Sequence, residues 1–209
     1  MKTALIIHGM PSKREYFNPA NPSPSNNHWF PWLQRQLILN GVLAQTPEMP
    51  TPYEPRYEAW AAMLGQFHID EDTMLVGHSL GGGFLVRWLS EYKGRVGRVV
   101  LVAPWLDPNK ELTTSFFDFS IDPALAGKTR DSAVFISDDD DQEELASLET
   151  LKNTVTGLRV KEFTGRGHFI LEHMGTEEFP ELRDYLVREK QKLTIHRKGK
   201  EIIIRDWSR

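Results

Sequence analysis

The chain alternates between short apolar runs and longer stretches of mixed polarity from its first residue to about residue 192. The apolar runs predict strands near residues 3–7, 42–46, 73–76, 99–103, 133–137 and 158–163. The stretches between them predict helices near 29–40, 56–67, 80–92, 142–154 and 177–192. Strands that alternate with helices pair into a parallel sheet with helices on both faces. We therefore expect an α/β fold, a three-layer α/β/α sandwich with a mostly parallel sheet, as one domain over residues 1–192.

The last residues have a different pattern. Two β-prone runs, 193–197 and 201–205, flank Lys198-Gly199-Lys200, which predicts a hairpin with Gly199 at positive φ. An isolated hairpin is marginally stable in water, so its isoleucines and Trp207 need a surface to cover. We expect residues 193–209 to be a C-terminal hairpin extension. It packs on its own domain, pairs with a second copy in a homodimer, which we favour, or stays a disordered basic tail.

One motif stands between a predicted strand and a predicted helix. Gly77-His78-Ser79-Leu80-Gly81 matches the pattern Gly-x-Ser-x-Gly, in which a strained strand-to-helix turn exposes the serine hydroxyl above the sheet. The pattern alone is weak, but the apolar run before it and the helix after it make coincidence less credible. Ser79 is therefore the candidate nucleophile, against the alternative of an ordinary serine in a glycine-rich turn.

The candidate base comes from three downstream histidines, because the chain order in this arrangement is Ser, then Asp or Glu, then His. His168 ends a strand and a glycine-rich loop, which suits a base. His173 reads as a surface residue at the start of a short helix, and His196 lies in the charged tail. The spacing of His168 and His173 does not place both on one helix face, so no metal site is expected.

The candidate acid lies in a run of four aspartates, Asp138 to Asp141, that follows the strand near 133–137. Four adjacent carboxylates cannot all point into one site, because like charges raise one another's pKa. We expect one to turn inward and the rest to solvate or cap the acidic start of the helix at Gln142. Spacing does not choose among them, and Asp107 is a further candidate.

Several pieces of the sequence together resemble the small serine hydrolases of the retinoblastoma-binding protein 9/YdeN family, in the α/β-hydrolase superfamily. The resemblance runs from about Lys2 to about Leu186. Its most specific pieces are Trp29 and Trp32, which open the first long helix, the pair Met49-Pro50, and Gly167-His168-Phe169. The chain departs from the family in a longer loop over residues 10–28, in polar residues after the aspartates where an apolar-Pro pair is common, and in its C-terminal extension.

The resemblance implies a catalytic triad. In the family the catalytic aspartate is the second of a pair that follows Ser and one variable residue, which falls on Asp140, with Asp139 next if the register slips by one. Ser79, His168 and Asp140 would cleave a small ester, thioester or amide through an acyl-enzyme intermediate, with no cofactor. The family's pocket-protein partner binds through a cysteine-containing motif, and this chain has no cysteine.

Two further features surround the expected site. The backbone N–H groups of Leu80 and Met10 are the candidate oxyanion-hole donors, because one follows the nucleophile and the other follows the first strand. The aromatic residues Trp105, Phe116 and Phe117 lie in an insert over residues 104–130. They either cap the site and line the substrate pocket, or pack the insert onto the body.

Composition limits the class of protein. The 209 residues, 40% of them hydrophobic, suit one domain with a sizeable core. The net charge of −4 favours neither nucleic acid nor anionic membrane, and the apolar runs are too short to span a bilayer. We expect a cytoplasmic protein with a small-molecule substrate. The alternatives are a non-catalytic binding protein that retains the fold, or peroxidase-type chemistry on the same fold.

Overall fold

The computed structural model describes residues 1–188 in full and the backbone of residues 192–197 and 200–205. Its main sheet contains β1 (Thr3–Ile7), β2 (Leu43–Gln45), β3 (Thr73–His78), β4 (Val96–Val102), β5 (Thr129–Ser137) and β6 (Val160–Phe163). Their order is β2-β1-β3-β4-β5-β6, and every neighbouring pair is parallel. The predicted strands are confirmed, with ends that differ by a few residues.

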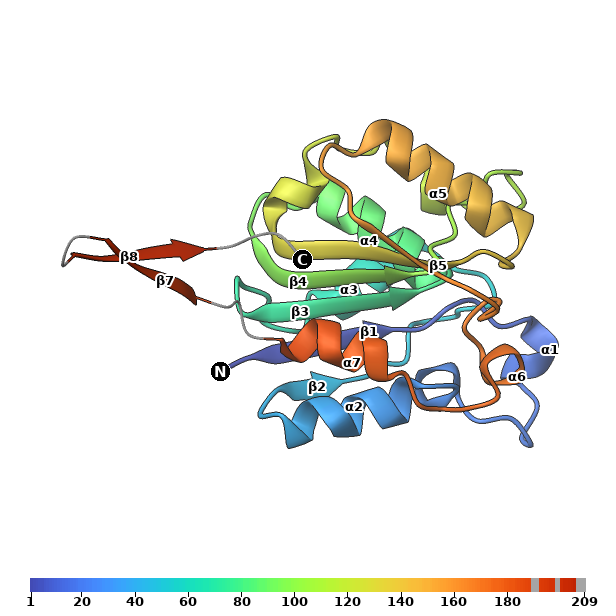
Figure 1. The fold of residues 1–209 in the computed structure, drawn as a ribbon. Coiled ribbons are helices and arrows are strands. Elements are labelled where there is room, and N and C mark those ends of the chain that lie inside the picture. The colour runs from blue at the N-terminus through green and yellow to red at the C-terminus, as the bar shows by residue number, and fades with distance from the viewer. Residues whose placement is uncertain (189–191, 198–199, 206–209) are drawn as a thin grey trace.

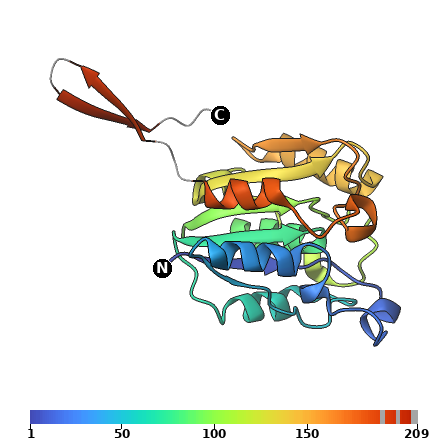
Figure 2. The ribbon, with the colours of Figure 1, turned by 60° about the horizontal axis from the view of Figure 1, so that its bottom comes forward.

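Helices cover both faces of this sheet (Figures 1 and 2). One face carries α2 (Phe30–Leu39) and α7 (Pro180–Val187), and the other carries α3 (Tyr57–Leu64), α4 (Leu80–Glu91) and α5 (Gln142–Thr154). Alternate residues of β1 supply the two cores, since Leu5 and Ile7 pack with α3 and α4 while Ala4 and Ile6 pack with α2 and α7. Burial on both faces explains why the strands read as continuous apolar runs. The three-layer α/β/α arrangement is confirmed.

The parallel topology brings the carboxyl ends of all six strands to one edge of the sheet. The segments that leave β1, β3, β5 and β6 at this edge carry Gly9, Ser79, Asp140 and His168, respectively. Ligands of open α/β sheets bind beyond this edge, where the strand order reverses direction. The fold therefore gathers residues that are far apart in sequence.

The loop after β1 contains regular structure although its sequence is rich in proline and asparagine. It contains one helical turn, α1 (Lys13–Tyr16), and a 3-10 turn over Pro24–Asn26. Ser12 and Glu15 form a reciprocal capping box, in which each side chain accepts a hydrogen bond from the other's backbone N–H. This pairing satisfies two otherwise free donors at the start of α1, which stabilises a turn that composition alone would not predict.

The last helix is shorter than predicted. A single turn, α6 (Leu171–Met174), precedes it, and α7 begins at Pro180 rather than near residue 177. Proline suits the first position of a helix and disfavours helical backbone in the residue before it. At the other end, the Arg98 guanidinium donates hydrogen bonds to the carbonyl oxygens of Leu186 and Arg188. These contacts satisfy orphan carbonyls where α7 stops.

The C-terminal hairpin is present as a separate antiparallel pair of β7 (Lys192–Arg197) and β8 (Lys200–Arg205). Thr194 lies opposite Ile203 in its register. The predicted turn at Gly199 and the predicted role of Trp207 lie outside the described residues. Among the helices that the structure describes, none combines the length and the apolarity that crossing a bilayer requires.

Candidate active site

Ser79 occupies a sharp turn between β3 and α4. Its backbone has φ 52° and ψ −122°, a strained conformation for a residue with a side chain. Two contacts hold it there, because its N–H donates to the Val102 carbonyl at 3.0 Å and its own carbonyl accepts from Trp105 N–H at 3.1 Å. A Cβ on Gly81 would lie 2.5 Å from the carbonyl oxygens of Ile7 and His8. The turn therefore needs glycine at this position for steric reasons.

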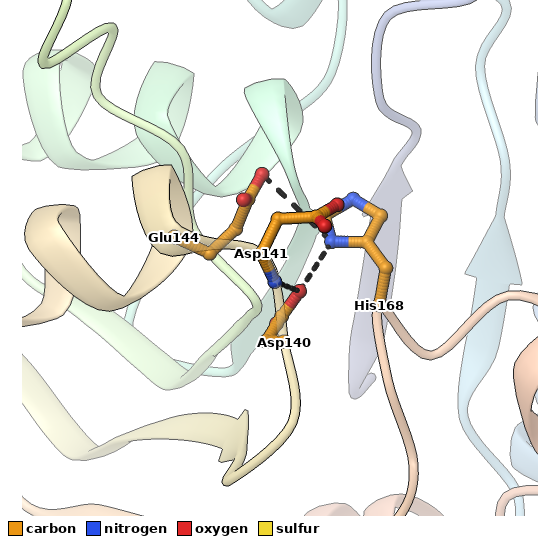
Figure 3. Close-up of side chains that lie close together, drawn as sticks. All are labelled: Asp140, Asp141, Glu144 and His168. Atoms are coloured by element: carbon orange, nitrogen blue, oxygen red, sulfur yellow. Dashed lines mark hydrogen bonds and ion pairs between the residues drawn. The ribbon is translucent and has the colours of Figure 1, made fainter.

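His168 and Asp140 meet across the loops that follow β6 and β5. The Nδ1 atom of His168 lies 2.9 Å from Oδ1 of Asp140, whose side chain is fully buried (Figure 3). The Asp141 N–H donates to the same oxygen at 2.9 Å. Burial alone lowers the pKa of His168, but the hydrogen bond and charge of Asp140, with the charge of Glu144, outweigh it and raise that pKa above its usual value. The imidazole is thus oriented and made more basic by its surroundings.

None of the other candidate acids hydrogen-bonds the His168 ring. Asp138 accepts from Gly165 N–H, and Asp139 accepts from the Ser137 hydroxyl and Gly167 N–H. Both carboxylates therefore hold the loop that carries His168 rather than its ring. Asp141 is exposed at the start of α5, and the Asp107 carboxylate accepts from the N–H groups of Glu111 and Leu112. Of the candidate acids, the structure pairs Asp140 with His168.

Three side chains fix the backbone around His168. The Nε2–H of His78 donates to the His168 carbonyl at 2.8 Å, and Trp29 Nε1–H donates to the Phe169 carbonyl at 3.0 Å. Nδ1 of His173 accepts the His168 N–H at 2.8 Å. Complete burial, and then the nearby His168 and His28, lower the pKa of His78 well below its usual value, so it remains a neutral donor. His78 and His173 thus support the loop.

The segment after β1 lies against the nucleophile. A Cβ on Gly9 would lie 3.1 Å from Cβ of Ser79 and 3.5 Å from its Oγ. His8 anchors this segment, because its Nδ1–H donates to the Gly9 carbonyl and its Nε2 accepts from Met49 N–H. Leu80 is the first residue of α4, so its N–H has no acceptor within the helix. Met10 follows Gly9 directly and is partly exposed.

A pocket with a volume of about 590 Å³ opens over these groups. Ser79 and His168 both line it, together with His8, Gly9 and Met10. Much of the remaining wall comes from the loop after β1 and from the segment after His168. These lining residues are Pro11, Glu15, Tyr16, Asn21, Pro22, Pro24, Asn27, His28, Phe30, His78, Ile170, Leu171, Glu172 and Glu177.

The aromatic side chains of the insert pack into the core rather than along this pocket. Phe116 is fully buried against Trp60 and Phe84, and Trp105 and Phe117 pack in the same hydrophobic cluster with α3 and α4. None of the three predicted pocket residues, Trp105, Phe116 and Phe117, lines the pocket over Ser79. For this pocket, their assignment is replaced by the alternative in which the insert packs onto the body. Aromatic side chains bury a large area, and these three bury it against the core.

Glu144 is a site residue that sequence reasoning missed. Its carboxylate Oε1 lies 3.8 Å from Nδ1 of His168, and its side chain is only 8% exposed (Figure 3). Asp140, Asp141, Glu144 and His168 each bring one ligand atom within 4.8 Å of the others, but Nδ1 of His168 is hydrogen-bonded to Asp140, so the cluster is an acid–base arrangement rather than a ligand set. The spacing of His168 and His173 does not reveal this cluster, because its carboxylates come from α5 and the turn before it. The helical sequence around Glu144 indicated only a solvated, acidic helix start.

Comparison with known proteins identifies the class. A family described as serine hydrolase matches residues 19–188. The chain is 31% identical over 185 residues to the putative hydrolase YdeN of Bacillus subtilis strain 168, covering 84% of this chain and 95% of that protein. The crystal structure of the B. subtilis ydeN product superposes with a TM-score of 0.74 at 30% identity, covering 89% of this chain and 97% of that one.

More distant structures share the fold. A YdeN-like hydrolase from Pectobacterium atrosepticum has a TM-score of 0.58 at 14% identity over 88% of this chain and 89% of its own. Est1E from Butyrivibrio proteoclasticus has a TM-score of 0.59 at 13% identity, covering 89% and 85% of the two chains. The fold is that of the α/β-hydrolases. The chain belongs to the serine hydrolase family, and its relatives within that family are YdeN-like hydrolases.

Proposed function

We propose that this hydrolase cleaves a small ester, thioester or amide through a triad of Ser79, His168 and Asp140. The observation that carries the proposal is the pocket, which is lined by both the serine of the strained turn and the histidine that is paired with a buried aspartate. Nucleophile, base and orienting acid are the three groups that acyl transfer through a serine requires. They follow three different strands, β3, β5 and β6, whose carboxyl ends lie at one edge of the sheet.

In the first half of the reaction, Ser79 Oγ attacks the substrate carbonyl carbon while His168 Nε2 takes the hydroxyl proton. Asp140 accepts the Nδ1–H of His168, which keeps Nε2 free as the acceptor and stabilises the imidazolium that forms. The leaving alkoxide, thiolate or amine then takes the proton from the imidazolium. Serine remains esterified, and water activated by the same histidine hydrolyses this acyl-enzyme.

The carbonyl oxygen becomes an anion in the transition state and needs donors. The N–H of Leu80, free at the start of α4, and the N–H of Met10, the residue after Gly9 on the loop after β1, would serve as that pair. Each such donor contributes about 3 kcal/mol of transition-state stabilisation. His8 supports the second donor indirectly, because it ties the Gly9 carbonyl and Met49 N–H to one rigid side chain.

The proposal is tested by covalent labelling followed by turnover. A fluorophosphonate should label the wild-type protein at Ser79 and leave Ser79→Ala unlabelled. A panel of p-nitrophenyl esters of rising acyl length, with matched thioesters and aminoacyl amides, should then define the leaving group and acyl chain. A folded wild-type protein that neither labels nor turns over any of these substrates would favour a binding protein that retains the fold.

A further inference from the structure

Glu144 is buried where the local helix chemistry does not require it. Asp141 is the N-cap of α5, so Glu144 is the third residue of the helix, the position from which a capping-box glutamate reaches back to the N-cap N–H. In this structure the Asp141 N–H donates instead to Oδ1 of Asp140. The Glu144 side chain turns toward His168, with Oε1 3.8 Å from Nδ1 (Figure 3). Helix capping therefore does not account for it.

The surroundings of Glu144 bring the pKa of its carboxyl group close to neutral pH. The pKa of Glu144 is raised to about 7, and burial of the side chain is the largest cause. The charges of Asp140 and Asp141 also raise this pKa, whereas the charge of His168 lowers it. Its neighbour Glu143 faces away, accepting from Trp105 Nε1–H and from the Asn109 amide. His78 also lies near the His168 ring, with ring centroids 4.9 Å apart, and His28 lies 6.3 Å from His78. Glu144 and His168 thus form a coupled pair of titrating groups.

We propose that Glu144 is a positioning residue, whose carboxylate places a second negative charge beside the His168 imidazole and so sets the pH range in which His168 acts as base. This inference rests on the proposed function. At 3.8 Å the carboxylate is too far to replace Asp140 as the hydrogen-bond acceptor of Nδ1–H. It is close enough to favour the imidazolium electrostatically, since opposite charges act on a pKa within about 4–6 Å, and it raises the pKa of His168 more than the exposed Asp141 does. Asp140 orients the ring, and Glu144 adjusts its basicity.

The coupling has a definite sign. Above about pH 7 Glu144 is ionised and makes His168 more basic. As the pH falls, Glu144 and His168 together bind one proton, which can reside on either residue. The apparent pKa of this step therefore belongs to the pair. Removing the Glu144 charge should therefore leave a His168 that titrates alone and at lower pH. A less basic imidazole is also a weaker general base, which lowers the limiting rate.

The experiment compares wild type with Glu144→Gln, which keeps the shape and removes the charge. The His168 ring nitrogens are followed by NMR from pH 4 to 10, and kcat and KM are measured over the same range. In Glu144→Gln we expect the His168 midpoint and the acid limb of kcat/KM to move down together by about one pH unit. The limiting kcat should fall about three- to tenfold, with KM unchanged.

Two further variants complete the test. Glu144→Asp keeps the charge on a shorter side chain and should restore part of the shift. Glu149→Gln makes the same change on an exposed residue of α5 that pairs with Lys152, and should leave the midpoint where it is in wild type. A His168 midpoint in Glu144→Gln equal to that of wild type would overturn the proposal. The NMR midpoint remains informative if no substrate is turned over, so loss of the proposed function and loss of this inference are separate results.

Discussion

The turn at Ser79 and the acidic turn after β5 supply two parts of one site in opposite ways. At Ser79 the backbone is confined by sterics, since a Cβ on Gly81 would collide with the segment that leaves β1. At residues 138–141 four identical side chains follow one another; distant partners give Asp138, Asp139 and Asp140 different tasks, and Asp141 is left exposed as the N-cap of α5. The Ser79 turn is specified by the absence of a side chain on Gly81, and the acidic turn is specified by the contacts that each carboxylate makes. Substitution should therefore affect the two regions differently.

The largest effect is expected at the nucleophile. Ser79→Ala should abolish turnover and fluorophosphonate labelling, and His168→Ala should reduce turnover nearly as much, because the two act as a unit. Neither change should disturb the fold, which circular dichroism can verify. Turnover that survives in Ser79→Ala would show that the strained turn serves another purpose.

Asp140→Asn should be the next most damaging change, with a loss of about 10³- to 10⁴-fold in kcat, because an amide no longer holds the required tautomer of His168. Asp138→Asn and Asp141→Asn should stay close to wild type, since neither carboxylate hydrogen-bonds the ring: Asp138 accepts from Gly165 N–H, and Asp141 is exposed at the start of α5. Steady-state kinetics of the three variants compares aspartates of the same run whose carboxylates point in different directions. Equal losses in all three would mean that the total charge of the run matters, and not the partner of each aspartate.

At the Ser79 turn, the expected effect is on stability. Gly81→Ala would force backbone atoms of the β1 segment to move, at a cost of about 3 kcal/mol. Gly127→Ala is the matched control, because a Cβ there meets nothing within 4 Å and its φ is ordinary. Urea unfolding should give a lower midpoint for the first variant and a wild-type or higher midpoint for the second. Equal midpoints would remove the steric account of this turn.

The acidic turn should show a stability effect that depends on pH. The pKa of Glu144 is raised from 4.5 to about 7 in the folded protein, so the folded state holds a proton that the unfolded state has released between these values. Stability from this group is full below about pH 4 and declines as the pH rises to about 7. Glu144→Gln should therefore be more stable than wild type at pH 8 by about 2–3 kcal/mol, and nearly equal at pH 4. Urea unfolding at both pH values measures this, and a constant difference would mean that charge is not its source.

The sequence alone determined the layered α/β fold and the position of Ser79. Strands buried on both faces must be apolar throughout, and the sharp turn needs small residues at fixed offsets, so both leave patterns within a short window. The order in which the candidate acid and base follow Ser79 along the chain could be predicted from the sequence as well. These features depend on interactions between residues close in sequence or on burial that every strand shares.

Only the tertiary structure decided how the acidic turn is used. Asp140 is distinguished from its neighbours by a loop 28 residues further along, and Glu144 by the same loop, which no local pattern encodes. The aromatic side chains of the insert likewise pack into the core, because α3 and α4 present an apolar surface to them. A turn of carboxylates presents several directions at once. The partner that reaches one of them sets its role, and that partner is brought there by the packing of the whole sheet.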